Sequence, residues 1–202
     1  MKKEVVLASG NAGKLHEFEE ILGPLGYTVL PQKDVVGPLD VDETGDTFEE
    51  NALLKAQAVY ERCGKMVISD DSGVVVDALG GAPGVYTARY AGPEADNEKN
   101  IDKLLYELRD VPEDKRTARF VSVVCCVLPD GSHFFARGEC EGHIGYERRG
   151  QGGFGYDPVF LVGDKSYAEM SDEEKNAISH RGRASRLFLT LLKEKEKQYA
   201  DQ

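Results

Sequence analysis

Apolar runs of strand length alternate with segments of helical spacing along the first third of this 202-residue chain. The runs with the length of buried strands are at residues 5–8, 27–30 and 66–69. Apolar side chains recur at helical spacing in the segments between them, 14–22 and 47–62. Farther along, the run 119–128 and the segment 133–141 flank a Pro-Asp-Gly-Ser turn, which predicts a long β-hairpin. Alternating strands and helices followed by a hairpin predict an α/β fold with a mixed β-sheet.

Turn residues and capping residues divide the rest of the chain. The polar stretch 32–46 contains Pro38 and predicts a loop, and residues 70–73 predict a hinge between strands at 66–69 and 74–76. The remaining expected elements are a capping box at Thr47 and Glu50, a loop at 78–84, a helix at 97–108, a glycine-rich loop at 150–155, a strand at 159–162, a capping box at Ser171, a last helix at about 183–197 and a frayed charged tail at 193–202. The chain has no repeat and no obvious linker, so we expect a single domain over residues 1–202.

Composition excludes several classes of protein. Hydrophobic residues make up 41% of the chain, which is enough for a sizeable core, and the formal net charge is −11. Proteins that bind nucleic acids are usually basic, so no nucleic-acid partner is expected. No apolar run approaches the roughly 20 residues that span a bilayer, and the run after Met1 to Lys3 is too short for a signal peptide. We therefore expect a cytoplasmic protein with no membrane partner.

Cysteine usage points to a reducing compartment. The four cysteines are Cys63, Cys125, Cys126 and Cys140, and no CxxC pair occurs among them. Two of them lie within the apolar run 121–128. Reduced thiols in the core are therefore expected, rather than a disulfide or a zinc site.

A short polar turn between the first strand and the first helix is suited to binding an anion. It consists of Ser9, Gly10, Asn11, Ala12, Gly13 and Lys14. Small residues allow close approach of the backbone, and a helix N-terminus and a lysine both attract phosphate. An ordinary strand-to-helix turn with an exposed lysine is the alternative. A P-loop is disfavoured because Leu15 follows Lys14 where a hydroxyl is required.

Two adjacent carboxylates, Asp70 and Asp71, follow the buried strand at 66–69. Buried carboxylates are costly unless they are paired, hydrated or bound to a metal ion. Oxygen ligands suit Mg²⁺, which typically takes one or two protein carboxylates together with substrate phosphates. Successive strand residues point in opposite directions, so we expect only one of the two to reach a metal ion. A turn capped by aspartates is the alternative.

Further acidic and polar residues surround the start of the second helix. Glu49 and Glu50 lie in its first turn, where they can simply complement the helix dipole, but Glu43 lies before the helix and has no such role. Asn51 and Lys55 are four residues apart and share one helix face. This polar face is either solvated or lines a site.

Two later segments have the residue types needed to bind a nucleobase. Phe154 lies among glycines in the loop 152–158, where an aromatic ring can stack on a base or pack in the core. Lys175, His180 and Arg181 form a basic cluster on an acidic protein. Lysine and arginine donate hydrogen bonds to base carbonyls, although such a cluster can also compensate a helix dipole.

Taken in order, these motifs resemble those of the inosine triphosphate pyrophosphatase family, the dITP/XTP pyrophosphatases, over about residues 3–193. The matching motifs are SGNxxKxxE at 9–17, ETG at 43–45, FxxNAxxKA at 48–56, DDSG at 70–73, GGAPG at 80–84, GGFGYDP at 152–158 and SHR at 179–181. The resemblance implies an elongated mixed sheet flanked by helices, with two lobes and a central nucleotide cleft, and a homodimer. It also implies Mg²⁺-dependent hydrolysis of ITP, dITP, XTP and dXTP to the monophosphate and pyrophosphate, which cleanses the nucleotide pool.

The resemblance also implies a role for each motif residue. Residues 9–14 hold the phosphates, Ser72 contacts the substrate, and Lys55 acts near the phosphates. Glu43 and Asp71 hold the metal ion, and Asp71 is the base for the attacking water. The residues that flank the nucleobase are Phe154, Gly155, Tyr156 and Asp157. The residues that read the 6-oxo edge of the purine are Lys175, His180 and Arg181.

Two other functions remain open. One is a related pyrophosphatase that acts on modified pyrimidines or methylated nucleotides, with similar phosphate chemistry but a different base pocket. The other is a nucleotide-sensing protein that no longer hydrolyses its ligand. Loss of a carboxylate would favour the sensor, but Glu43 and Asp71 are both present.

Overall fold

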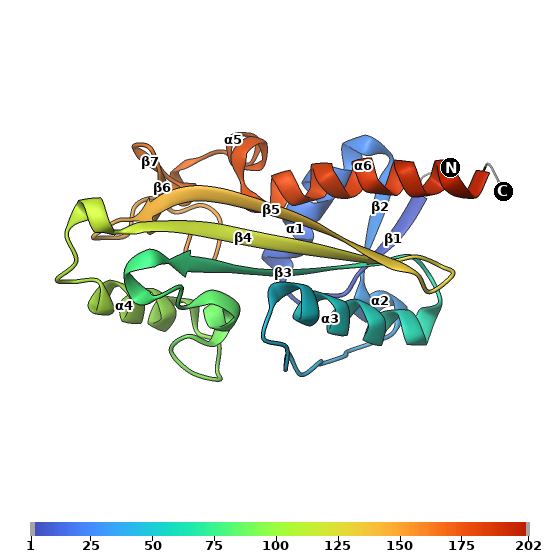
Figure 1. Ribbon diagram of the computed structural model, residues 1–202, viewed down its shortest axis with the longest axis horizontal. Helices are drawn as coiled ribbons and strands as arrows, with labels where there is room; N and C mark the ends of the chain where they lie inside the picture. Colours follow the sequence, from blue (N-terminus) through green and yellow to red (C-terminus); the bar gives the residue numbers. More distant parts are fainter. Residues whose placement is uncertain (1–2, 201–202) are drawn as a thin grey trace. The chain divides into compact units, whose positions relative to one another are not determined.

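A computed structural model of the protein describes residues 3–200 and contains one seven-stranded sheet in the order β2-β1-β3-β4-β5-β6-β7 (Figure 1). The strands are β1 (Lys3–Leu7), β2 (Tyr27–Pro31), β3 (Val67–Val76), β4 (Thr117–Val127), β5 (His133–Ile144), β6 (Phe160–Val162) and β7 (Lys165–Ser166). β1 pairs in parallel with β2 and β3, and β6 pairs antiparallel with β5 and β7. The predicted α/β fold with a mixed sheet is therefore confirmed.

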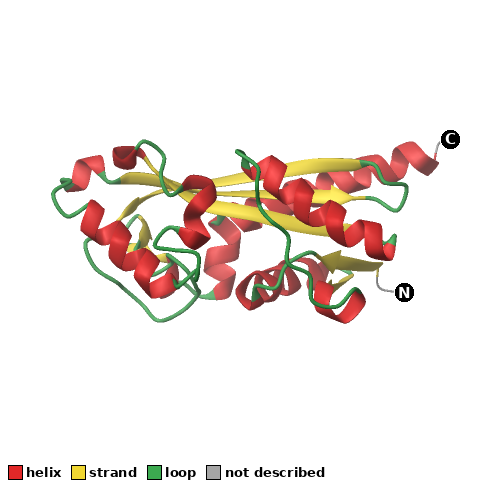
Figure 2. Ribbon diagram, turned by 90° about the horizontal axis from the view of Figure 1, so that it is seen from below, coloured by secondary structure: helices red, strands yellow, loops and turns green. Residues whose placement is uncertain are grey.

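Helices flank these strands (Figure 2). The α-helices are α1 (Ala12–Leu22), α2 (Gln32–Val35), α3 (Phe48–Cys63), α4 (Asn97–Glu107), α5 (Asp172–Ile178) and α6 (His180–Ala200). Short 3-10 helices are η1 (Gly23–Leu25), η2 (Asp77–Leu79), η3 (Gly84–Arg89), η4 (Glu113–Lys115) and η5 (Tyr167–Glu169). The predicted capping box at Thr47 and Glu50 is confirmed at the start of α3. Across residues 3–200, no helix combines the length and apolar character needed to cross a membrane.

The predicted hinge at residues 70–73 is wrong, because β3 runs without interruption from Val67 to Val76. Asp70 and Asp71 are buried within this strand, at 1% and 4% exposure. Both carboxylates lie against cationic side chains, so the chain does not have to turn outward to solvate them.

Several other boundaries differ from the sequence prediction. The predicted loop 32–46 begins with helix α2, and the side-chain amide of Gln32, its first residue, donates to Leu39 O in the segment after the helix at 2.8 Å. The predicted loop 78–84 overlaps η2 and η3. α6 begins at His180 and continues to Ala200. The predicted frayed tail at 193–202 is therefore helical up to Ala200, and residues 201–202 lie outside the described part. At α5, the Ser171 side chain caps the helix by accepting from Glu174 N at 3.1 Å.

The chain divides into two compact units. Residues 3–71, 122–138 and 181–200 belong to the first, and residues 72–121 and 139–180 belong to the second. β3, β4 and β5 contribute residues to both. The single domain over residues 1–202 remains a prediction.

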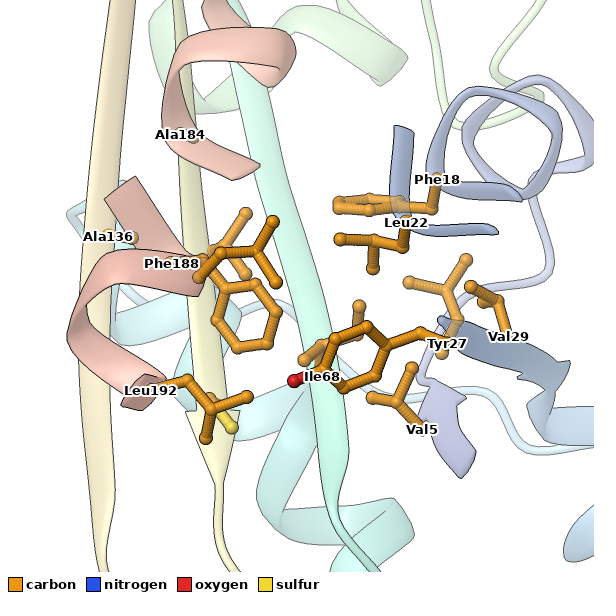
Figure 3. Packing of buried hydrophobic residues seen from close by; sticks show 14 of the residues in the cluster. Val5, Phe18, Leu22, Tyr27, Val29, Ile68, Ala136, Ala184, Phe188 and Leu192 are labelled. Carbon is orange, nitrogen blue, oxygen red and sulfur yellow. The ribbon is translucent and has the colours of Figure 1, made fainter. Parts of the chain in front are cut away.

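The first unit buries α1 and α6 against its strands (Figure 3). Phe188 of α6 is fully buried and stacks on Phe134, with ring centroids 6.0 Å apart. Figure 3 shows Phe188 and Leu192 facing the side chains of Tyr27 and Ile68. Figure 1 shows α3 on the opposite side of the strands from α6.

The second unit has its own apolar core, to which α4 contributes side chains. It contains Ile101 and Leu104 of α4, Val74 of β3, and the aromatic side chains of Phe120 and Phe160. Two separate apolar clusters thus support the two units.

The cysteines have the expected state. All four are free thiols; Cys125, Cys126 and Cys140 are buried, and Cys63 is partly exposed. The prediction of free thiols in the core is confirmed for Cys125, Cys126 and Cys140, whereas Cys63, at the end of α3, is a free thiol outside the core.

Neighbouring residues of α6 allow a direct test of the first core. Phe188→Ala removes a side chain with no exposed surface, and we expect the free energy of unfolding to fall by about 3–5 kcal/mol. Leu187→Ala is the matched control, because Leu187 is 40% exposed and its loss should cost no more than about 0.5 kcal/mol. Urea unfolding followed by circular dichroism measures both, and equal losses would contradict the assignment of the core face.

Candidate functional site

Parallel pairing of β1 and β3 brings the first predicted motifs together. Val6 and Leu7 of β1 lie opposite Val67 and Ile68 of β3. β1 ends at Leu7, whereas β3 continues to Val76, so residues 9–14 leave the sheet beside Asp70 and Asp71 in the middle of β3. Ligands of open α/β sheets commonly bind where a parallel strand ends.

Asp70 is surrounded by cations from two helices. Its Oδ2 lies 2.8 Å from Lys14 Nζ of α1 and 3.1 Å from Arg181 Nη2 of α6, and Ser122 Oγ donates to Oδ1. Burial alone would raise the pKa of Asp70, but Arg181 and Lys14 outweigh it and hold that pKa well below its usual range. Asp70 is therefore ionised at neutral pH and fully engaged with protein groups.

Asp71 has a different environment from its neighbour. Lys55 Nζ of α3 lies 3.0 Å from Asp71 Oδ1 and 3.4 Å from Glu43 Oε1, so it bridges the two carboxylates. Asp71 Oδ2 is buried and has no hydrogen-bond partner among residues 3–200. Burial raises the pKa of Asp71 to about 6, although Lys55 opposes this shift. The two aspartates thus meet different partners, as the alternation of strand side chains predicts.

The residues around Asp71 fit a hard divalent cation. A buried carboxylate oxygen without a partner is unfavourable, and a cation would satisfy it. No group of three or more acidic, histidine or cysteine side chains suited to a metal ion occurs among the described residues. Glu43 and Asp71, the two carboxylates that Lys55 bridges, are the pair that would hold such a cation, and Mg²⁺ typically takes one or two carboxylates when substrate phosphates complete its coordination.

The turn after β1 has the local structure of an anion-binding loop. Asn11 caps α1 by accepting from Lys14 N at 3.1 Å, and Ser9 Oγ accepts from Asn11 N at 3.1 Å. The first N–H groups of a helix lack helical partners and attract anions. Lys14 is not the exposed lysine of the structural alternative, because its side chain is 15% exposed and its Nζ donates to Asp70 O at 3.1 Å.

A cavity of about 630 Å³ adjoins this turn within the first unit. Its lining residues are Ser9, Gly10, Asn11, Ala12, Leu15, Pro31, Gln32, Lys33, Pro38, Leu39 and Asp40. The turn therefore borders open space that a ligand can enter.

Arg181 has different neighbours from the other members of the predicted basic cluster. Its guanidinium is 2% exposed and forms ion pairs with Glu17 of α1 and Asp70 of β3. Glu17 and Ser122 are functional-site residues that sequence patterns alone did not reveal. Two signals could have pointed to them. Glu17 lies three residues after Lys14 on the same helix, and Ser122 is a polar residue within the apolar run 119–128.

The second unit places Lys175 and Asp157 together. Lys175 Nζ lies 2.7 Å from Asp157 Oδ2, and both side chains are almost fully buried. Phe154 N also donates to Asp157 Oδ2, at 3.0 Å, and Lys175 Nζ lies 5.1 Å from the centre of the Phe154 ring. Gly153 has a φ of +67°, and a Cβ there would collide with the Asp157 carboxylate. The loop is thus shaped to hold Asp157 and Phe154 beside the lysine.

The other predicted base-binding residues take varied positions. Tyr156 is buried, and its hydroxyl donates to Thr87 O at 2.7 Å, while Gly155 adopts a φ of +58°. His180 is buried and stacks on Phe120, with ring centroids 4.5 Å apart. Ser72 follows Asp71 in β3 and is half-buried. The roles of these residues remain predictions.

Known proteins resemble the chain along nearly its whole length. Among named relatives, the dITP/XTP pyrophosphatase of Halalkalibacterium halodurans is 49% identical over 181 residues, 89% of this chain and 93% of that protein. The dITP/XTP pyrophosphatase of Bacillus subtilis is 47% identical, covering 94% of this chain and 97% of that protein.

Solved structures of two related proteins have the same fold as this chain. The Ham1 protein of Staphylococcus aureus has a TM-score of 0.83 and 43% identity, covering 96% of this chain and 100% of that one. A HAM1 protein from Coxiella burnetii also has a TM-score of 0.83, with 41% identity, covering 95% and 99%. The family model of the Ham1 family matches residues 5–191. The family resemblance expected from the motifs is therefore confirmed, and the chain belongs to the Ham1 family.

Proposed function

We propose that this protein hydrolyses deaminated purine nucleoside triphosphates, namely ITP, dITP, XTP and dXTP, to the monophosphate and pyrophosphate. By removing them it would keep deaminated bases out of DNA and RNA. Relatives with the name dITP/XTP pyrophosphatase support the reaction, at 47–50% identity. The observation that carries the proposal is the buried Asp71 carboxylate, with one oxygen on Lys55 and the other without a partner among residues 3–200.

At the phosphate end, we assign binding to the turn at residues 9–14. The start of α1 supplies backbone N–H groups, and Lys14 supplies a positive charge beside them. Lys55 lies across the two carboxylates that we assign to the metal ion. The two lysines stabilise negative charge on the departing pyrophosphate, and they allow a protein of net charge −11 to bind a polyanion.

Asp71 is assigned as the base that orients the attacking water. Its Oδ2 is free of protein hydrogen bonds within residues 3–200, so one lone pair of this oxygen would face the cation and the other would accept the proton of the attacking water. Burial raises the pKa of Asp71 above its usual range in the metal-free protein, although Lys55 opposes this shift. Glu43 and Asp71 would hold Mg²⁺, which when bound neutralises phosphate oxygens and lowers the pKa of water.

At the base end, we assign recognition of the 6-oxo group to Lys175, with Phe154 stacking on the purine. Lys175 carries only donors, which match a 6-oxo acceptor and oppose the 6-amino donor of adenine. A buried donor left without a partner costs about 1–3 kcal/mol, which disfavours ATP. Guanine also has a 6-oxo group, so this contact does not separate GTP from ITP. Contacts of His180 and Arg181 with the same edge are part of the proposal.

The family resemblance further leads us to propose a homodimer and a cytoplasmic location. The two units are proposed to act as one domain over residues 1–202. The location accords with the free thiols of all four cysteines.

A substrate panel tests the proposed reaction. Pyrophosphate release from ITP, dITP and XTP in Mg²⁺ should exceed release from ATP and GTP, with the ATP difference arising from the donors at Lys175. Chelation of divalent cations by EDTA is the control and should stop release. Equal rates on ATP would contradict the selectivity, and preference for dUTP or a methylated nucleotide would favour the related pyrophosphatases. Tight nucleotide binding without release would favour the sensor.

Lys175→Met tests how the base is read. We expect the ratio of kcat/KM for ITP over ATP to fall by about 10-fold to 100-fold, because a charge-assisted hydrogen bond is worth about 1.5–3 kcal/mol. A ratio of two substrates is insensitive to a general loss of folded protein. Lys165→Met is the matched control, since Lys165 belongs to the same unit and is 56% exposed. An unchanged ratio would remove Lys175 from base recognition.

A further inference from the structure

A buried amide on α3 holds the backbone N–H and C=O of Gly45. Asn51 has no exposed surface, and its Oδ1 accepts from Gly45 N at 2.8 Å while its Nδ2 donates to Gly45 O at 3.3 Å. Only this orientation of the amide satisfies both backbone groups, so the oxygen and nitrogen are assigned by the bonds themselves. The loop before α3 is therefore tied to the helix by two hydrogen bonds from one side chain.

The same loop has little freedom to move away from the helix. Residues 37–45 have no regular secondary structure. Glu50 adds a third link, because its carboxylate accepts from Asp46 N at 2.7 Å. A Cβ at Gly45 would approach Glu50 Cβ to 2.6 Å and Asn51 Oδ1 to 2.8 Å, so only glycine fits against the amide.

This link lies between Glu43, which we assign to cation binding, and Lys55, which forms an ion pair with it. Glu43 is two residues before Gly45, and Lys55 is one helical turn after Asn51 on the same face of α3. Lys55 then bridges Glu43 and Asp71. The position of Glu43 relative to Lys55 thus depends on how firmly the loop is fixed to the helix.

We propose that Asn51 is a positioning residue that fixes Glu43 for the divalent cation through the backbone N–H and C=O of Gly45. This inference rests on the proposed function, because it takes Glu43 as a metal ligand. Outer contacts that orient metal ligands typically change metal affinity by about 10-fold to 100-fold when they are lost. Loss of the Asn51 amide should therefore raise the cation requirement rather than lower the rate at saturating cation.

The test compares two buried asparagines that make the same kind of contact. Asn51→Leu removes both hydrogen bonds to Gly45 and keeps the branched shape of the side chain, and the added volume of the two methyl groups is the same in the control below. Asn100→Leu is the matched control: Asn100 is also fully buried, donates to Ala88 O at 2.8 Å and accepts from Ala91 N at 2.7 Å, within the second unit. Glu43→Gln is the reference for loss of the ligand itself.

Two measurements are made on each full-length variant. The first is binding of Mn²⁺ alone, followed by its electron paramagnetic resonance signal without nucleotide. The second is the Mg²⁺ concentration that gives half-maximal pyrophosphate release from ITP. We expect Asn51→Leu to weaken Mn²⁺ binding and to raise the Mg²⁺ requirement by about 10-fold, with the rate restored at high Mg²⁺. Asn100→Leu should match the wild type in both.

The outcomes separate the inference from the function on which it rests. If Glu43→Gln leaves both measurements unchanged, Glu43 is not a ligand, and the proposed metal site and the inference are both overturned. If Glu43→Gln weakens binding but Asn51→Leu does not, or if Asn100→Leu weakens it equally, only the inference fails. If Asn51→Leu does not fold, Gly45→Ala replaces it, since its Cβ displaces the same loop while the amide remains. Unchanged cation binding in that variant would overturn the positioning role.

Discussion

The structure depends on the burial of two adjacent carboxylates in the middle of one strand. Moving a charged carboxylate out of water is costly, and it is tolerated only where cations and hydrogen bonds compensate it. Asp70 is compensated by Lys14, Arg181 and Ser122. Asp71 receives Lys55 on one oxygen only. The first carboxylate is thus neutralised by the protein, and the second retains capacity for a cation or a proton.

These contacts join the helices of the first unit to its sheet. The compensating cations come from α1, α3 and α6, which are distant in sequence. Lys14 and Arg181 reach Asp70, and Lys55 reaches Asp71, the next residue of β3. Glu17 extends the arrangement by pairing with Arg181. The same ion pairs therefore do two things: they hold α1, α3 and α6 against β3, and they gather the charged side chains of the candidate site.

The fold was largely predictable from local pattern, and the site only in part. The strand and helix periods of residues 5–62 and the hairpin predicted the mixed sheet, because those periods reflect burial directly. The continuity of β3 was not predictable, since an Asp-Asp-Ser-Gly segment favours a turn unless distant cations compensate it. The pairing of Arg181 with Glu17 was hidden for the same reason: the two are 164 residues apart in sequence. Proximity of residues 9–14 to Asp70 followed from parallel pairing of β1 and β3, which the alternation of strands and helices implied.

The central claim is that the two aspartates divide stability and chemistry between them, and comparison of Asp70→Asn with Asp71→Asn tests it most directly. The pKa of Asp70 is lowered in the folded state, so its charge stabilises the fold, and its loss should cost about 3–5 kcal/mol of unfolding free energy. The pKa of Asp71 is raised to about 6, so its charge opposes folding at neutral pH, and Asp71→Asn should leave stability unchanged or higher. The same variant should lose at least about 100-fold in turnover of ITP. Retained turnover in Asp71→Asn, or a loss of stability equal to that of Asp70→Asn, would contradict the account.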